Sequence, residues 1–349
     1  MEIGAMANKR LVAVALALTL VGTCTSVVLA GNKDKKGSAG ALELLIPVGS
    51  RIAGMGGAGG AIVNGNEAMF WNPAGLDASP ASAEVTFSHL NWIFDTSVEW
   101  FAVSAKFGRI GSIGISGKIF DFGDIHETTE FETEGTGRVI SPTFITLGLT
   151  YSRQMTDRIY FGLNAKLISE SFLRMSSNGV AFDFGVQYIS QAGLRMGLAL
   201  NNLGPMMKYQ GPDLQRTVQL PHTEAGAEPL DLRIEAQSYE LPSNFEISLA
   251  YPLKLGAAQQ VTGLFSYRNH NASSDEWQGG VEYAFNDMLF VRGGYGWAGE
   301  DQANYIFGFS AGAGLKYRLP GGTTFVIDYA YRDVKWTDGN QWLTLSVQF

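Results

Sequence analysis

The chain has little cysteine and no excess of positive charge, and each shortage excludes a class of protein. Its single cysteine, Cys24, lies in the first 30 residues, so the rest of the chain forms no internal disulfide. A formal net charge of -8 and the lack of a Lys/Arg stripe argue against a nucleic-acid partner. After residue 30 no apolar run is long enough for a membrane helix. We therefore expect neither a disulfide-stabilised fold nor a helical membrane protein.

Convincing catalytic and metal-binding patterns are also missing. Gly308 to Gly312 match the G-x-S-x-G pattern of hydrolases, but the match lies inside an alternating strand rather than on a strand-to-helix turn. Gly54 to Gly59 fit a dinucleotide-binding G-x-G-x-x-G pattern, yet no βαβ pattern surrounds them. None of the four histidines stands at metal-ligand spacing from another histidine or a cysteine. We expect no enzyme activity, no cofactor and no metal site.

Residues 1–30 have the pattern of a cleaved secretory signal peptide. The charged pair Lys9-Arg10 precedes an apolar run from Leu11 to Val21, and small or apolar residues end the segment at Ala30. A membrane anchor is the alternative, but the apolar run is short for a span. We expect an exported protein.

Polar/apolar alternation runs through most of the remaining chain. In the last nine residues, Leu343, Leu345, Val347 and Phe349 alternate with Trp342, Thr344, Ser346 and Gln348. Such a strand has one face in an apolar medium and the other in water. The pattern predicts about fourteen strands, at 83–92, 98–107, 111–120, 142–153, 159–172, 179–189, 194–202, 244–251, 259–268, 276–285, 288–297, 305–317, 323–331 and 341–349.

The links between these strands alternate in length. The two longest links, Asp121 to Ser141 and Gly204 to Ser243, fall on the same predicted rim, and the opposite rim has only short turns. This asymmetry is typical of membrane barrels, and it puts both termini on the short-turn, periplasmic side. The sequence predicts an all-β fold, a transmembrane antiparallel β-barrel of about 14 strands in the bacterial outer membrane, spanning 83–349. A soluble β-sandwich is the alternative, and it would explain the alternation but not the loop asymmetry.

The same alternation assigns side chains to the two faces of the wall. Phe307 and Phe309 are assigned to the lipid side, and the terminal Phe349 to a barrel-insertion signal for the barrel-assembly machinery. Outer-membrane lipid is the expected surrounding partner. Charges inside spanning strands are tolerated on the lumen face, where they pair or meet water. A polar network between plug and wall is the favoured interpretation of these charges, and a permeation path is the alternative. The charges assigned to the lumen are Lys106, Lys166, Asp183, Glu282, Arg292, Lys316 and Asp328.

Residues 31–82 precede the first predicted strand and are rich in Gly and Ala from about residue 45. Small residues let backbone pack closely inside a confined lumen, and Asn72-Pro73 favours a turn that ends a helical stretch near 67–71. We expect an N-terminal hatch folded into the lumen, and a periplasmic tail is the alternative. The expected hatch motif residues are Arg51, Gly54, Met55, Gly56, Gly57, Asn72, Pro73 and Gly75.

Two runs in this segment, R-x-x-G-M-G-G-A from Arg51 to Ala58 and N-P-A-G-L from Asn72 to Leu76, carry a family resemblance. With these runs upstream of a barrel, the chain resembles the PorV/PorQ family, whose members look like relatives of the FadL-type fatty-acid channels. The resemblance covers the whole mature length. It implies a fourteen-stranded barrel with an N-terminal hatch.

The resemblance implies two alternative functions. The first is a part in protein secretion or cell-surface assembly of the type IX kind, with secreted proteins or secretion-system components docking on the two long loops. The alternative is a FadL-like channel for hydrophobic small molecules such as long-chain fatty acids. That mechanism needs an apolar pocket between hatch and wall. The expected lining of this pocket is Phe70, Trp71, Trp100 and Phe290.

Overall fold

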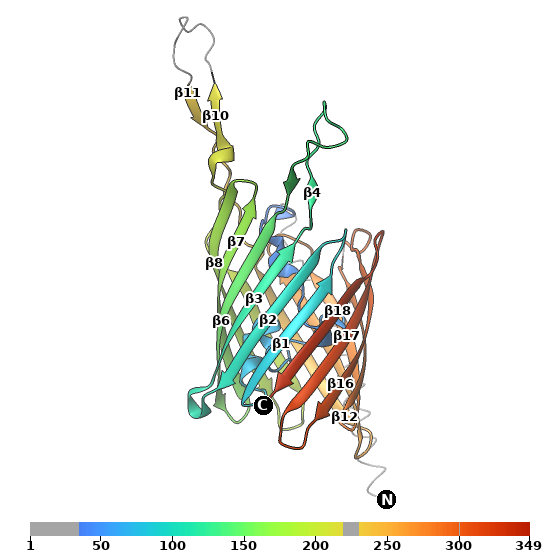
Figure 1. Cartoon of the computed structure of the whole chain (residues 1–349). Coiled ribbons are helices and arrows are strands. Elements are labelled where there is room, and N and C mark those ends of the chain that lie inside the picture. The colour runs from blue at the N-terminus through green and yellow to red at the C-terminus, as the bar shows by residue number, and fades with distance from the viewer. Residues whose placement is uncertain (1–34, 219–229, 300) are drawn as a thin grey trace, which may run out of the picture. The chain divides into compact units, whose positions relative to one another are not determined.

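A computed structural model of the chain describes residues 35–218, 230–299 and 301–349. The predicted signal peptide, residues 1–30, lies outside this range. Within the described residues, 14 antiparallel strands close into a barrel (Figure 1). The wall consists of β1 (Ala83–Asn91), β2 (Ser97–Lys106), β3 (Ser112–Asp121), β6 (Thr143–Thr156), β7 (Ile159–Phe172), β8 (Met175–Ile189), β9 (Arg195–Leu203), β12 (Asn244–Lys254), β13 (Gln259–His270), β14 (Glu276–Phe285), β15 (Leu289–Trp297), β16 (Phe307–Arg318), β17 (Thr324–Val334) and β18 (Asn340–Gln348).

Each wall strand pairs with its neighbour in sequence, and β18 closes the ring on β1. The closing pair runs from Glu84 opposite Gln348 to Asn91 opposite Gln341 without a register shift. Closure leaves no free strand edge, so every wall strand has hydrogen-bond partners on both sides. The expected barrel of about 14 strands is confirmed.

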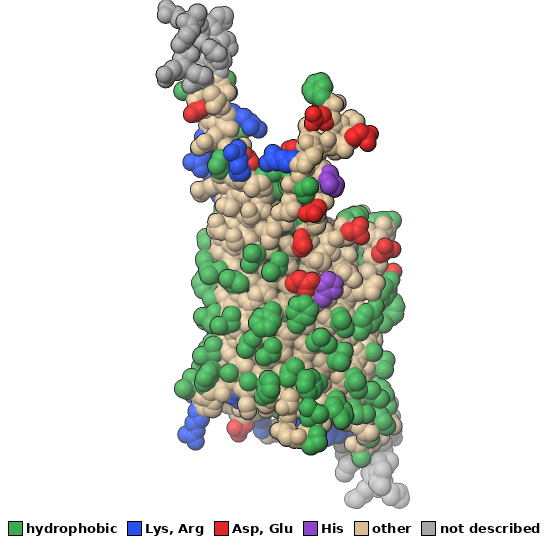
Figure 2. Space-filling view, viewed as in Figure 1, with side chains coloured by type: hydrophobic (Ala, Val, Ile, Leu, Met, Phe, Trp, Pro, Cys, Tyr) green, Lys and Arg blue, Asp and Glu red, His purple; other side chains and the backbone are tan. Residues whose placement is uncertain are grey.

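The two faces of the wall have opposite chemistry. On β18, Leu343 and Leu345 are 45% and 44% exposed, whereas Trp342 and Thr344, which alternate with them, are 0% and 2% exposed. On the face of the barrel seen in Figure 2, the outward hydrophobic side chains form a broad band, and most of the charged residues lie above or below it. An outward apolar band between two polar rims is the surface that a lipid bilayer requires.

The two rims also differ. Two hairpins rise from one rim in Figure 1: β4 (Ile125–His126) with β5 (Val139–Ile140), and β10 (Gln215–Val218) with β11 (Leu230–Arg233). They occupy the two long links predicted from the sequence. The chain ends at the opposite, short-turn rim, where Ser82 N donates to Phe349 O at 2.7 Å.

The expectation that the chain also starts on the short-turn side is wrong for the first described residues. Lys36 Nζ lies 2.9 Å from Asp301 Oδ2, and Gly37 N donates to Ala272 O at 3.1 Å, both in links of the long-loop rim. The segment then passes through the lumen to reach β1. Turn lengths fix the direction of the strands, but they do not constrain the chain that precedes the first strand.

Short helices and connecting turns form the hatch that fills the lumen. The hatch helices are η2 (Leu42–Leu45), α2 (Ser50–Ala53), α3 (Ala68–Trp71) and η3 (Pro73–Leu76). Two further turns, η4 (Gly108–Ile110) and η5 (Pro212–Leu214), lie in links between strands. Among the described residues, no helix is long and apolar enough to cross a membrane.

One assignment of faces on β16 is wrong. The sequence assigns Phe307 to lipid, but its ring lies 3.9 Å from the Arg332 guanidinium on the lumen side. The register of β16 against β17 shifts between Phe307 and Ser310, where three steps on one strand meet two on the other. This bulge inverts the alternation, because one extra residue moves the side chains before it to the other face. Phe309, beyond the inversion, is 54% exposed as expected.

Candidate functional site

The glycine-rich run of the hatch lies directly against the wall. A Cβ on Gly280 of β14 would lie 2.5 Å from Met55 O, and a Cβ on Gly294 of β15 would meet the same carbonyl at 2.5 Å. Gly54 also lies close to Gly312 of β16, although less tightly, since its Cβ would lie 3.2 Å from the Gly312 Cα. Hatch and wall therefore meet backbone to backbone, and glycine is required on both sides of the contact.

The Asn-Pro turn forms a second contact with the wall. Asn72 is 0% exposed, and its Nδ2 donates to Gly60 O at 3.0 Å and to Val186 O and Leu198 O at 3.3 Å. Its Oδ1 accepts from Ala74 N at 3.2 Å, which caps η3. One side chain thus ties the hatch to itself and to two wall strands, which explains why Asn precedes Pro here.

The wall beside this turn is also glycine. A Cβ on Gly185 of β8 would meet the Asn72 side chain and Pro73, and a Cβ on Gly162 of β7 would meet the Pro73 backbone. Within the hatch, a Cβ on Gly75 would collide with Val63 O. The glycines of the wall and the motif residues of the hatch are therefore parts of one contact surface.

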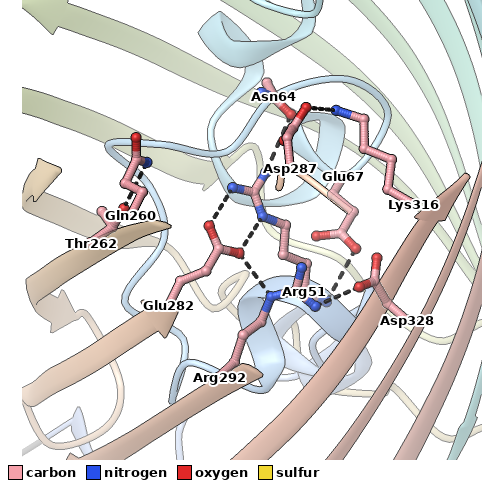
Figure 3. A network of polar contacts seen from close by, with 10 residues as sticks. All are labelled: Arg51, Asn64, Glu67, Gln260, Thr262, Glu282, Asp287, Arg292, Lys316 and Asp328. Atoms are coloured by element: carbon pink, nitrogen blue, oxygen red, sulfur yellow. Dashed lines mark hydrogen bonds and ion pairs between the residues drawn. The ribbon is translucent and has the colours of Figure 1, made fainter. Parts of the chain in front are cut away.

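A buried ion network locks the hatch to the other side of the wall (Figure 3). Arg51 of α2 donates from Nε and Nη2 to the two carboxylate oxygens of Glu282, each at 3.0 Å. Arg292 Nε donates to the same carboxylate at 2.8 Å, and its Nη1 pairs with Asp328. The wall members Glu282, Arg292 and Asp328 are 5%, 4% and 5% exposed. Hatch motif and lumen charges, predicted separately, meet in this network.

Glu67, next to α3, faces the same network. Its Oε1 accepts from Arg51 N at 3.4 Å (Figure 3). Burial raises the pKa of Glu67 to about 7, and the negative charge of Asp328 acts in the same direction. Arg51 opposes the shift. Burial also raises the pKa of Glu43 in η2 to about 7, so the hatch carries two carboxyl groups that change charge near neutral pH.

The other predicted lumen charges have separate partners. Lys166 Nζ lies 2.7 Å from Asp183 Oδ2 in a buried pair. Lys106 donates to Asp77 O and Ser79 O, both at 2.8 Å, near the short-turn rim. Lys316 pairs at 2.8 Å with Asp287 of the neighbouring turn. These charges form local pairs rather than a continuous row through the barrel.

A cavity of about 180 Å³ lies on the long-loop side of the hatch. Its apolar lining comes from the entering segment, with Leu44 and Ile46, and from α3, with Phe70 and Trp71. The rings of Phe70 and Trp71 meet edge to face, with centroids 5.2 Å apart. Trp71 is fixed further because its Nε1 donates to Val48 O at 3.0 Å. The two hatch aromatics expected from the sequence therefore line this cavity.

The two wall aromatics expected there do not line it. Trp100 is 3% exposed and packs in the core that joins α3 to β1 and β2. The ring of Phe290 lies against Arg292, with the guanidinium carbon 5.1 Å from its centroid. Both side chains point inward, as alternation requires, but their positions along the strand put them away from the cavity.

The wall contributes polar groups to the cavity that sequence analysis missed. Arg268 lies between two carboxylates, with Nη2 2.7 Å from Glu246 Oε2 and Nη1 3.6 Å from Glu276 Oε2. His270 lies two residues past the end of the predicted strand 259–268, is the last residue of β13 and is 6% exposed. Arg332 lies one residue past the predicted end of its strand. Extending the alternation by two residues on these strands would have found both positions.

Within the described part of the chain, no group of three or more His, Cys, Asp or Glu residues could hold a metal ion. The cavity is lined by aromatic, cationic, carboxylate and amide groups, and the hatch lies on its short-turn side.

No protein-family model matches this chain, and no curated protein sequence matches it. Solved structures match its fold over most of its length. The Pseudomonas putida toluene transporter TodX aligns at 13% identity and a TM-score of 0.57 over 87% of this chain and 99% of its own. The monoaromatic hydrocarbon channel CymD aligns at 14% identity and a TM-score of 0.54, covering 87% of this chain and 98% of its own. A Pseudomonas aeruginosa FadL homologue aligns at 12% identity and a TM-score of 0.54 with the same coverage.

These likenesses extend over nearly the whole of each neighbour. None of them brings support for the PorV/PorQ resemblance in particular. The chain has the fourteen-stranded, hatch-filled barrel fold of the FadL-like outer-membrane proteins.

Proposed function

We propose that the chain is an outer-membrane channel for small hydrophobic molecules, with the hatch as its gate. The observation that carries this proposal is the cavity between α3, the entering segment and the wall. The cavity lies on the long-loop side of the hatch, and the aromatic side chains of α3 line it. An engineered cavity of about 150 Å³ in another protein binds benzene, so about 180 Å³ suits a molecule with a single ring.

Two of the solved structures with a similar fold support the same function. TodX is described as a toluene transporter and CymD as a monoaromatic hydrocarbon channel. A hydrophobic solute would enter from the long-loop rim and bind against Phe70 and Trp71, where its apolar surface is removed from water. It would pass further only when the hatch moves. The hatch is held by non-covalent contacts, which makes such movement physically accessible.

The secretion role has less support. It predicts docking surfaces on the links 121–141 and 204–243, and these links do form the raised hairpins β4–β5 and β10–β11. Raised loops are common to many barrels, however, and the fold neighbours favour the channel. The secretion role stays a hypothesis, and crosslinking in native membranes tests it: recovery of assembly factors alone would count against it.

A transport assay tests the channel. Purified protein is reconstituted into liposomes, and the entry of labelled toluene and of a labelled hydrophilic sugar is followed. We expect faster entry of toluene than in protein-free liposomes and no change for the sugar. Replacing Phe70 by Ser should weaken toluene binding, because a polar hydroxyl replaces ring contact. Equal entry of toluene with and without the protein would contradict the proposal.

A further inference from the structure

Three polar side chains from neighbouring strands stand side by side on the wall of the cavity. Ser310 of β16 is in register with Arg332 of β17, and Arg332 is in register with Asn340 of β18. Ser310 and Asn340 are both 0% exposed. Ser310 and Arg332 line the cavity directly, and Asn340 lies beside Arg332. We call these three residues the Arg332 row.

The row has unused hydrogen-bonding groups. Among the described residues, no partner reaches Ser310 Oγ, Arg332 Nε, Arg332 Nη2 or either side-chain polar atom of Asn340. Buried polar atoms nearly always have partners in native proteins, and leaving one unpaired destabilises the fold. Several unpaired atoms in one register row therefore point to a bound group that completes them.

The unpaired atoms identify the chemistry of that group. Nε and Nη2 form one edge of the guanidinium fork, the edge that holds a carboxylate through two parallel hydrogen bonds. The Ser310 hydroxyl and the Asn340 amide add further donors on either side. Every member of the row can donate, so the complementary group is an acceptor with negative charge.

The acidic residues of the cavity do not occupy this fork. Glu246 and Glu276 are held by Arg268, at 2.7 Å and 3.6 Å. Gln278 donates to Glu276 as well, at 3.0 Å. The Arg332 guanidinium instead packs on aromatic rings, 3.9 Å from the centroid of Phe307 and 5.0 Å from that of Trp342. The guanidinium therefore has rings on its face, while its Nε and Nη2 have no hydrogen-bond partner among the described residues.

We infer that the Arg332 row recognises a carboxylate on the transported molecule, so that the cavity selects ring-sized aromatic acids over plain hydrocarbons. The inference deepens the proposed function and rests on it. The ring of such a ligand packs on the aromatic groups of the cavity, and its carboxylate receives the fork of Arg332. The hydrocarbon named for the fold neighbours has no group that could satisfy this row.

Binding of two probes of similar size tests the inference. Benzoate carries the ring and the carboxylate, and toluene carries the ring alone. Binding to detergent-solubilised protein is followed by calorimetry and by the fluorescence of the tryptophans near Arg332. We expect the benzoate Kd to rise about tenfold or more in Arg332→Met, because a charge-assisted pair is lost, while toluene changes less than about twofold. Arg332→Lys should be intermediate, since it keeps the charge without the fork.

The matched control is Lys335→Met. Lys335 lies just past the end of β17 and is exposed, so the variant removes the same charge at the same rim, away from the row. An unchanged benzoate Kd in Arg332→Met, or an equal loss of benzoate in the control, would overturn the inference. An equal loss of toluene in Arg332→Met would also overturn it, because it indicates a change of cavity shape. If toluene still enters in every variant, the proposed channel stands whatever happens to benzoate binding. If toluene neither binds to nor enters through the wild type, the proposed channel function itself is contradicted.

Discussion

The backbone contact between hatch and wall makes the substitution Gly294→Ala the sharpest test of the gate. An added Cβ would lie 2.5 Å from Met55 O and closer still to the Met55 carbonyl carbon and Gly56 N. Ordinary carbon contacts lie at about 3.5–4.0 Å, so the hatch backbone must retreat by about 1 Å. None of these contacts is the flexible end of a side chain, so the displacement falls on the hatch as a whole.

The expected magnitude follows from overpacking, which costs typically about 1–3 kcal/mol in a closely packed interior. If that cost falls on the docked hatch, the ratio of undocked to docked molecules rises about 5-fold to 150-fold. Single-channel recordings in planar bilayers should then show more frequent open events. Cells that carry the variant in their outer membrane should become sensitive to bulky antibiotics.

The neighbouring residue supplies the control. Gly293 points outward, and an added Cβ would have its nearest contacts at 3.9 Å and 4.0 Å, which are ordinary packing distances. Gly293→Ala changes the same strand by the same atoms and should leave conductance unchanged. Wild-type conductance in Gly294→Ala, or an equal rise in both variants, would refute the reasoning that close glycine contact holds the gate.

Three further predictions concern the hatch. Arg51→Met removes both hydrogen bonds to Glu282, whose carboxylate keeps its contact with Arg292. We expect the docking of the hatch to weaken by about 2–3 kcal/mol and conductance to rise, and an unchanged conductance would show that the ion network does not control opening. Because burial raises the pKa of Glu67 to about 7, above its ordinary 4.5, the docked hatch is favoured at low pH and loses stability as pH rises from about 4.5 to about 7. Open events should increase from pH 5 to pH 8, and Glu67→Gln should reduce that increase, the rest coming from Glu43, whose pKa is raised in the same way; an unchanged increase in Glu67→Gln would contradict the role of Glu67. The hydroxyl oxygens of Ser50 and Thr344 are 2.7 Å apart, so the double variant Ser50→Cys/Thr344→Cys should form a disulfide that fixes the hatch to β18. Toluene entry should then stop until reductant is added, and entry at the wild-type rate through the oxidised variant would contradict gating by hatch movement.

The strands could be predicted because their pattern is local. A residue in a barrel wall faces lipid or lumen, so period-two alternation records the environment directly in the sequence. The predicted strand ends fall within a few residues of those in the structure, and the largest difference, at β8, is four residues. Where the backbone leaves the regular pleat, the prediction fails, as for Phe307 before the bulge on β16.

The partners of the hatch could not be predicted in the same way. Arg51 and Glu282 are 231 positions apart, and nothing in their own neighbourhoods says that they meet. The positions of Trp100 and Phe290 could not be predicted either. Alternation correctly gives the inward direction of both side chains, but their height in the barrel, which decides whether they line the cavity, depends on the shear of the whole wall.

The amino-acid sequence by itself determined the barrel, the orientation of its rims and the presence of a glycine-rich segment ahead of the first strand. These features follow from local chemistry: alternation with period two, the lengths of turns, and residues small enough for close backbone contact. Only the tertiary structure decided that this segment starts at the long-loop rim, that its arginine locks onto wall carboxylates, and that Ser310, Arg332 and Asn340 form one row. Those outcomes depend on strand register around a closed ring, in which residues far apart in the chain become neighbours.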